Sequence, residues 1–67
     1  MSIAVGSDQV RLLRVEDAAR LLNIGRAAVY DLIRSRRLRT VKIGASRRVP
    51  REAIDEVIAL LIEESTQ

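Results

Sequence analysis

Arginine is concentrated in the middle of this 67-residue chain, where its side chains could bind a polyanion. Residues 26–51 hold nine of the twelve basic residues but only one acidic residue, Asp31. Residues 1–25 carry three basic and three acidic residues, whereas residues 52–67 carry five acids and no base. The formal net charge of +3 therefore hides a strongly polarised molecule. A basic patch of this kind attracts a polyanion, and duplex DNA is the usual one.

The kind of basic residue also favours DNA. Eleven of the twelve are arginine, and Lys42 is the exception. A guanidinium group can hold a phosphate or a guanine edge through two parallel hydrogen bonds, which an ammonium group cannot do. A gene of high GC content also raises the arginine count, and a solvated basic face is the competing interpretation. That interpretation is the weaker one, because a random surface rarely excludes acids from a whole segment.

Composition argues against several other classes of protein. The chain has neither cysteine nor histidine, so thiolate and imidazole metal sites and the usual catalytic bases are missing. Tyr30 is the only aromatic residue, which argues against base stacking on single strands or RNA. No apolar run approaches 18 residues, and residues 1–7 lack the pattern of a secretion signal. We expect a cytoplasmic, nucleoid-associated protein that is not an enzyme and has no cofactor or metal.

The pattern of apolar residues predicts two short helices, over residues 15–22 and 26–35. Asn23-Ile24-Gly25 supplies the break, because Asn tolerates the left-handed backbone that ends a helix, and Ile24 is expected to fill the corner. Two helices joined by such a turn are typical of a helix-turn-helix. The residues expected to face inward are Ala18, Ala19, Leu21 and Leu22 on the first helix, and Val29, Leu32 and Ile33 on the second.

Residues 38–49 change to short β-rich runs on either side of Gly44-Ala45-Ser46, which predicts a β-hairpin. A hairpin directly after the second helix can act as a wing that reaches a neighbouring groove or the DNA backbone. Pro50 suits the first position of a third helix, whose apolar residues repeat to residue 62. The predicted fold is mainly α with a small β-hairpin, a winged helix-turn-helix in the order helix, helix, hairpin, helix.

A chain of this length supports one small domain at most. We expect the domain to span residues 10–62, with a flexible N-terminal tail over residues 1–9 and a C-terminal tail over residues 63–67. A short extended segment is expected before the first helix, formed by Val10, Leu12 and Leu13. A core of this size contributes little net stability, and the chain has no cysteine to form a disulfide. We therefore expect additional stability to come from a partner, which could be another copy, another protein or nucleic acid.

The open face of the second helix and the wing carry the residues expected to bind DNA. Arg26 and Ala27 are the best candidates for reading bases, because the N-terminal part of a recognition helix enters the major groove. Asp31 could accept a hydrogen bond from cytosine, but an ion pair with Arg34 is the favoured alternative. For Tyr30, a phosphate contact and packing against the wing are weighted equally. The complete predicted set is Arg26, Ala27, Tyr30, Asp31, Arg34, Arg37, Arg39, Lys42, Ser46, Arg47 and Arg48.

The third helix is expected to close the core and to contact a partner. Its core residues are predicted to be Ile54, Val57 and Ile58. Residues 59–62 are apolar all round the helix, a surface that so small a domain cannot wholly bury. We therefore expect a contact with another copy or with a partner protein through Leu60, Leu61 and Ile62.

The run from Leu13 to about Ile58 resembles the small excisionase and MerR-like winged helix-turn-helix domains. The matching segments are V-E-D-A-A-R-L-L-N-I (15–24), A-V-Y-D-L-I-R (28–34), L-R-T-V-K-I-G (38–44) and R-R-V-P-R-E-A-I (47–54). The resemblance implies a sequence-specific duplex DNA-binding protein, an excisionase that binds repeated sites, cooperates with neighbouring copies and helps an integrase in site-specific excision. A small transcription regulator of the same fold is the alternative. A protein-interaction adaptor that uses the third helix is a rival from another class.

The chain departs from the family pattern at the helix caps, in one turn and in the wing. Arg14 and Gly25 stand where Ser or Thr usually cap the first two helices, changes that each cost roughly 1 kcal/mol or less. Arg36 occupies a common glycine position, so the turn after the second helix is expected to be strained or reshaped. Arg47 stands where the wing commonly has an aromatic residue, and Asp31 where a basic residue is frequent.

Overall fold

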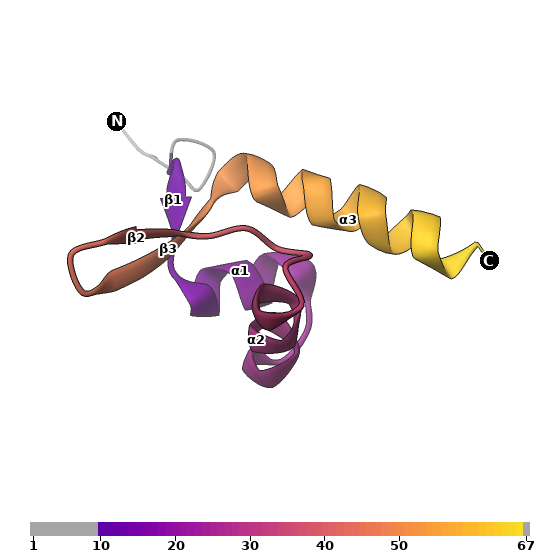
Figure 1. Cartoon of the computed structure of the whole chain (residues 1–67), viewed down its shortest axis with the longest axis horizontal. Helices are drawn as coiled ribbons and strands as arrows, with labels where there is room; N and C mark the ends of the chain where they lie inside the picture. The colour runs from indigo at the N-terminus through magenta and orange to yellow at the C-terminus, as the bar shows by residue number, and fades with distance from the viewer. Residues whose placement is uncertain (1–9, 67) are drawn as a thin grey trace, which may run out of the picture.

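Three helices and a small antiparallel sheet form the part of the chain that the computed structural model describes, residues 10–66 (Figure 1). In chain order the elements are β1 (Leu12–Leu13), α1 (Val15–Leu22), α2 (Arg26–Arg34), β2 (Val41–Ile43), β3 (Ser46–Pro50) and α3 (Arg51–Ser65). The predicted order of helix, helix, hairpin and helix is confirmed, as is the mainly helical fold with a small hairpin. The tail predicted for residues 1–9 lies outside the described residues.

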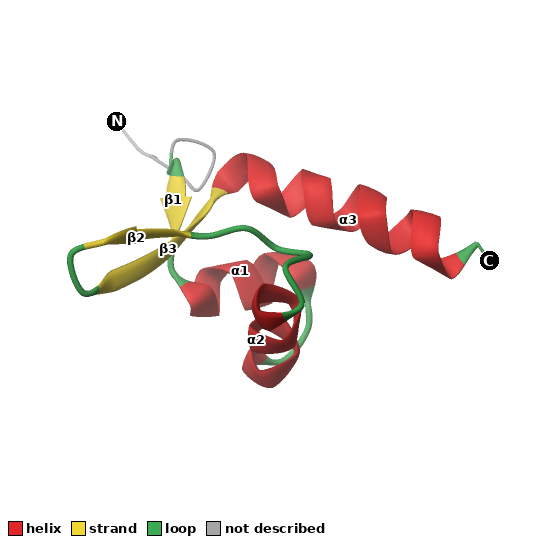
Figure 2. Ribbon diagram, in the orientation of Figure 1, coloured by secondary structure: helices red, strands yellow, loops and turns green. Residues whose placement is uncertain are grey.

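The sheet has β3 at its centre, with β1 on one side and β2 on the other (Figure 2). Both pairings are antiparallel, and Leu13 lies opposite Val49 in the β1–β3 ladder. The backbone N–H of Arg51 donates to the carbonyl of Arg11 at 2.8 Å, which extends this pairing by one step. The predicted short extended segment is therefore confirmed for Leu12 and Leu13, which form an edge strand, whereas Val10 lies outside it.

The core is aliphatic throughout and lies where α1, α2, α3 and β3 meet. Its buried members are Leu13, Val15, Ala18, Ala19, Val29, Leu38, Val49, Ala53, Ile54 and Val57. Leu22, Leu32, Ile33 and Leu61 pack against it from partly exposed positions. Ala18 and Ala19 are small, which lets α1 pack closely against α2 and the sheet. Within the described residues no polar or charged residue is buried, so the interior of the domain is stabilised by apolar packing.

Three of the residues expected to be inside are substantially exposed. Leu21 is 44% exposed, because the buried stripe of α1 follows Val15, Ala18, Ala19 and Leu22 and leaves Leu21 one helical step away. Ile58 is 40% exposed for the same reason, since Val57 and Leu61 face the core on α3. Ile24 is 38% exposed, so it does not fill the corner of the turn as expected.

Two left-handed residues shape the turns around α2. Asn23 ends α1 with φ 58° and ψ 45°, as the sequence predicts, and the N–H of Ile24 donates to the carbonyl of Ala19 at 3.0 Å. Arg36 has φ 67° in the turn after α2, at the position where a glycine was expected. There the N–H groups of Arg37 and Leu38 both donate to the carbonyl of Leu32, at 2.9 and 3.0 Å. The turn keeps a glycine-like shape although it contains an arginine.

The third helix differs from its prediction at both ends. Pro50 is the last residue of β3 and the N-cap of α3, so the helix begins one residue later than predicted. At the other end α3 continues to Ser65, so residues 63–65 are helical where a tail was expected. Neither α1 nor α2 has a side-chain hydrogen bond that caps its N-terminus. This is expected, because Arg14 and Gly25 stand at the positions where Ser or Thr usually supply such a bond.

The left-handed backbone at Arg36 leads to the first prediction. A residue with a Cβ atom costs roughly 1–2 kcal/mol in this conformation, and glycine avoids most of that cost at the expense of a more flexible unfolded chain. We expect Arg36→Gly to be more stable than Arg36→Ala by about 1 kcal/mol, measured by urea unfolding. Both variants lose the same charged side chain, so their difference isolates the backbone. Equal stabilities would show that this turn is unstrained.

Candidate nucleic-acid interface

The recognition helix α2 is held by its inner face, which leaves its outer face open. Val29 is fully buried against the core, and Leu32 and Ile33 lie half-buried beside it. The helix begins directly after Gly25, and its first two residues, Arg26 and Ala27, are exposed to solvent. The exposed residues of this face are Arg26, Ala27, Tyr30, Asp31 and Arg34, all five of those predicted from the sequence.

The wing projects from the body of the molecule as an exposed two-stranded ribbon. Its register places Lys42 opposite Arg47 and Val41 opposite Arg48. Arg47 donates from Nη1 to Oγ1 of Thr40 at 2.8 Å, and Arg48 donates from Nη1 to the carbonyl of Arg47 at 3.1 Å. Like charges placed directly across a ladder destabilise it and raise the local positive potential. The wing therefore presents a cationic surface that an anion would stabilise.

A shallow cleft joins the recognition helix to the wing. Tyr30 lines it from α2, Arg14 and Glu16 line it from the start of α1, and Arg47 and Arg48 line it from β3. The tyrosine ring is 36% exposed and lies at the junction of the three elements. Arg14 was not among the predicted site residues, and no local pattern could have included it. The start of α1 reaches the wing only because β1 pairs with β3.

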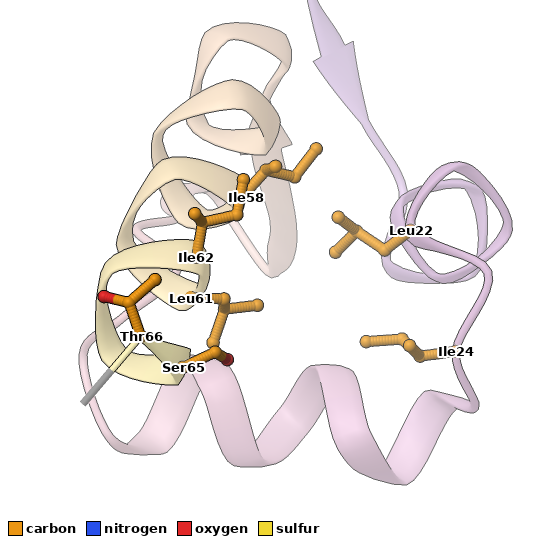
Figure 3. Close-up of a pocket in the computed structure, with 7 residues that line it drawn as sticks. All are labelled: Leu22, Ile24, Ile58, Leu61, Ile62, Ser65 and Thr66. Carbon is orange, nitrogen blue, oxygen red and sulfur yellow. The ribbon is translucent and has the colours of Figure 1, made fainter.

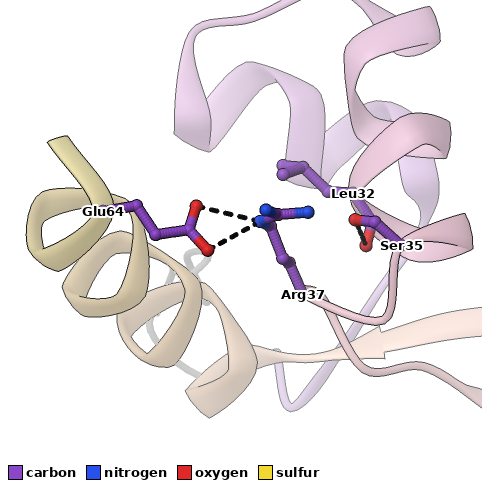
Figure 4. Close-up of polar contacts among 4 residues, drawn as sticks. All are labelled: Leu32, Ser35, Arg37 and Glu64. Carbon is purple, nitrogen blue, oxygen red and sulfur yellow. Dashed lines mark hydrogen bonds and ion pairs between the residues drawn. The ribbon is translucent and has the colours of Figure 1, made fainter.

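Two predicted site residues are turned towards α3 by ion pairs. Arg37 donates from Nε to both carboxylate oxygens of Glu64, at 2.9 and 3.0 Å (Figure 4). Arg39 holds Glu56 in a two-point contact, with Nε and Nη2 at 2.8 and 3.0 Å from the two oxygens. The hydrogen bond from Arg39 lowers the pKa of Glu56 below its usual value, and the same contact raises the pKa of Arg39. Both members of this pair therefore stay charged at neutral pH.

The remaining predicted cations are divided between a local pair and open positions. Asp31 and Arg34 form the ion pair along α2 that was the favoured alternative for Asp31. Among the described residues, Arg26 and Lys42 take part in no ion pair. Ser46 and Arg48 remain in the hairpin, as predicted. The structure thus gathers the α2 face and the wing into one surface, and it sets Arg37 and Arg39 at the edge of that surface.

An apolar groove lies away from this surface, between the helix-turn-helix and α3 (Figure 3). Leu22 and Ile24 line one wall, and Ile58, Leu61 and Ile62 line the other, around a volume of about 360 Å³. Ile62 is 61% exposed, whereas Leu61 packs partly against the core. Leu60 is half-buried and lines a second hollow together with Ile62 and Glu63. Ile62 therefore lines both hollows, with Leu61 on the side of the groove and Leu60 on the other side.

Comparisons with known proteins agree with this geometry. Residues 12–59 match the family described as "Helix-turn-helix domain". An "Excisionase" from Streptomyces ambofaciens is 49% identical over 47 residues, which cover 70% of this chain and 76% of that protein. The chain belongs to the excisionase family of helix-turn-helix proteins. The MerR-like part of the predicted resemblance stays a prediction.

A second relative of this excisionase-family chain is a "Probable excisionase" from Saccharopolyspora erythraea, 46% identical over 55 residues. The match covers 82% of this chain and 56% of that relative, so the chain spans little more than half of the relative's length. No solved structure shows a significant match. Within residues 10–66, no helix of the excisionase-family chain is both long and apolar enough to cross a membrane, and no group of carboxylates could hold a metal ion.

The register of the wing leads to the second prediction. Lys42→Glu places a carboxylate opposite Arg47, which replaces a repulsive cross-strand pair with an attractive one. We expect the wing variant to unfold at a higher temperature, with a gain of about 0.5 kcal/mol, and to bind duplex DNA more weakly. Lys42→Gln is the control, because it removes the repulsion without creating a pair. If Lys42→Glu binds DNA as tightly as the unmodified chain, the wing does not face DNA.

Proposed function

We propose that this chain is a sequence-specific duplex DNA-binding protein that acts as an excisionase and assists an integrase in site-specific excision. The observation that supports this most strongly is that the open face of α2 and the cationic wing form one surface. The names of the two relatives support the excision role in particular. No catalytic step is assigned to the protein, which we propose acts at the nucleoid by binding and bending DNA.

The surface divides naturally between reading bases and holding the backbone. The first turn of α2 enters the major groove, where Arg26 can hold a guanine edge and Ala27 can contact a thymine methyl. Lys42, Arg47 and Arg48 on the wing contact phosphates or the adjacent minor groove. Arg34 lies beside the base readers on the same face of α2, where it forms an exposed ion pair with Asp31.

A transcription regulator would use the same surface, so the structure of the DNA-binding face does not separate the two roles. The test is excision of a fragment flanked by attachment sites, carried out with an integrase that recognises those sites, in the presence and absence of this protein. Excision that requires the protein supports the proposal. Binding at a divergent promoter, without any effect on excision, would support the regulator instead.

The third prediction separates base reading from backbone contact. Arg26→Ala should relax preference at one base position and cost roughly 1–3 kcal/mol on the cognate site, because one bidentate contact is lost. Arg47→Ala should weaken binding to every duplex alike. The measurement is a titration of cognate and mutated sites at several salt concentrations. For the unmodified chain we expect a log–log slope of about −4 to −5. An Arg26→Ala variant with unchanged discrimination between sites would refute the assignment.

We also propose that α3 contacts a neighbouring copy or the integrase while α2 and the wing hold DNA. A single recognition helix with a small wing buries little surface, on the order of 600–1,000 Å², so one copy reads few base pairs. Ile62 is the most exposed of the large apolar residues on α3, and five acids around the helix keep it off DNA. The apolar groove beside it is open to a partner on the face that the DNA does not occupy.

The fourth prediction concerns this partner contact. Changing Leu60 and Ile62 to Ser should reduce cooperative binding to a fragment with several sites, because both changes remove apolar surface from α3. Affinity for a single site should stay the same. Leu61 is left intact because it packs against the core. Asp55→Ser, at an exposed position of the same helix outside both hollows, is a control, and circular dichroism confirms that each variant is folded. Full cooperativity in the double variant would place the contact elsewhere.

A further inference from the structure

The loop between α2 and β2 is tied to α3 by two ion pairs between residues far apart in the sequence. Arg37 reaches Glu64 across 27 residues, and Arg39 reaches Glu56 across 17 residues. In Figure 4 the Arg37 side chain extends from the loop to the carboxylate of Glu64 on α3. Both arginines come from the basic block that the sequence assigns to DNA, whereas both carboxylates come from the acidic helix. Each ion pair therefore joins an arginine of the basic segment to a carboxylate of the acidic helix.

The carboxylates of Glu56 and Glu64 accept hydrogen bonds from guanidinium N–H groups that could otherwise donate to a DNA phosphate. Arg39 presents Nε and Nη2 to the two oxygens of Glu56, which is the same fork that holds two phosphate oxygens. The side chains of both pairs are 40–53% exposed, so water and ions reach them. Surface ion pairs of this kind are weak, and a phosphate can compete with the carboxylate for the arginine. Each carboxylate thus reversibly occupies an arginine that could otherwise contact a phosphate.

The position of Arg39 places this competition at the edge of the DNA-binding surface. Arg39 lines one hollow together with Arg34 from the recognition helix and Arg47 from the wing. Thr40, which accepts the hydrogen bond from Arg47, lies in the same hollow. A backbone phosphate bound between α2 and the wing would therefore lie beside an arginine that Glu56 already holds.

We propose that Glu56 and Glu64 set the sequence-independent affinity of this protein for DNA, by occupying Arg39 and Arg37 and so removing two phosphate contacts. This inference rests on the duplex DNA binding proposed above. Sequence-independent affinity is supplied by phosphate contacts, whereas base contacts determine which site is preferred. Two fewer phosphate contacts weaken binding to all DNA alike, which leaves more of the protein free to search for its sites.

The experiment compares Glu56→Gln, Glu64→Gln and the double variant on a duplex of random sequence, from low to physiological salt. Each glutamine keeps the size of the side chain but releases one arginine. Since each added phosphate contact contributes about −0.9 to the log–log slope, we expect each single variant to steepen the slope by about that amount. The double variant should steepen it by about twice as much. At about 0.1 M salt each released arginine should tighten binding roughly fivefold to tenfold.

Glu63→Gln is the matched control. Glu63 is next to Glu64 on the same helix, and its carboxylate makes no ion pair with another described residue. The control changes the net charge by the same amount and should leave the slope unchanged. If Glu56→Gln and Glu64→Gln behave like Glu63→Gln, the inference is wrong. If the unmodified chain shows no salt-dependent binding to duplex DNA, the proposed function fails instead, and the two failures are distinguishable.

Two further measurements test the inference if a variant gains affinity for another reason or fails to fold. Combining Arg39→Gln with Glu56→Gln should abolish the gain of Glu56→Gln, because no arginine is then released. A gain that persists in the combination would overturn the inference. When random duplex is added, the Nε–Hε signal of Arg39 in NMR spectra should shift much more in Glu56→Gln than in the unmodified chain, where Glu56 occupies the arginine. A signal that shifts equally in both proteins would also overturn the inference.

Discussion

The strand β3 determines where every functional element of this domain lies. It pairs with β1 on one side and with β2 on the other, and α3 begins directly after its last residue. Val49, near its end, is fully buried and lies opposite Leu13. Because β1 leads directly into α1, this pairing fixes the helix-turn-helix relative to the wing. The recognition helix and the wing form one surface because two short ladders share a single strand.

The small core makes this arrangement depend on backbone geometry as much as on packing. Ten aliphatic residues form the buried cluster, and neither α1 nor α2 has a side-chain cap. The direction of α2 is set by Val29 on its inner face and by two left-handed residues, Asn23 before it and Arg36 after it. Arginine is an unfavourable choice at such a position. The left-handed turn nevertheless places the next residues, Arg37 to Arg39, within reach of α3.

The sequence was sufficient to predict the order and type of the elements, because helical and hairpin patterns are local. The sequence also predicted that α1 ends at Asn23, and the family resemblance predicted an altered turn at Arg36. It failed for Leu21 and Ile58, since periodicity shows that a helix has an apolar face but not where the centre of the buried stripe lies. That centre depends on which other elements pack against the helix, and those contacts are made by residues distant in the sequence.

The candidate site shows the same division between local and distant information. The exposed face of α2 follows from helical spacing, so all five of its predicted residues are found there. The ion pair between Asp31 and Arg34 is predictable from the sequence because it spans one helical turn. The pairing of Arg37 and Arg39 with α3 could not be foreseen, because it joins residues 27 and 17 positions apart. From composition alone these two arginines looked the same as the cations of the wing.

The shape of the molecule explains why some cations are neutralised and others are not. The tip of the hairpin and the C-terminal end of α3 lie at opposite ends of the longest axis (Figure 1). Glu56 and Glu64 on α3 pair with arginines of the loop that precedes β2. Among the described residues, Lys42 and Arg47 on the wing and Arg26 at the start of α2 form no ion pair with a carboxylate. A chain of modest net charge can in this way present a strongly cationic surface on one side, and it leaves an acidic helix with an apolar groove on the other.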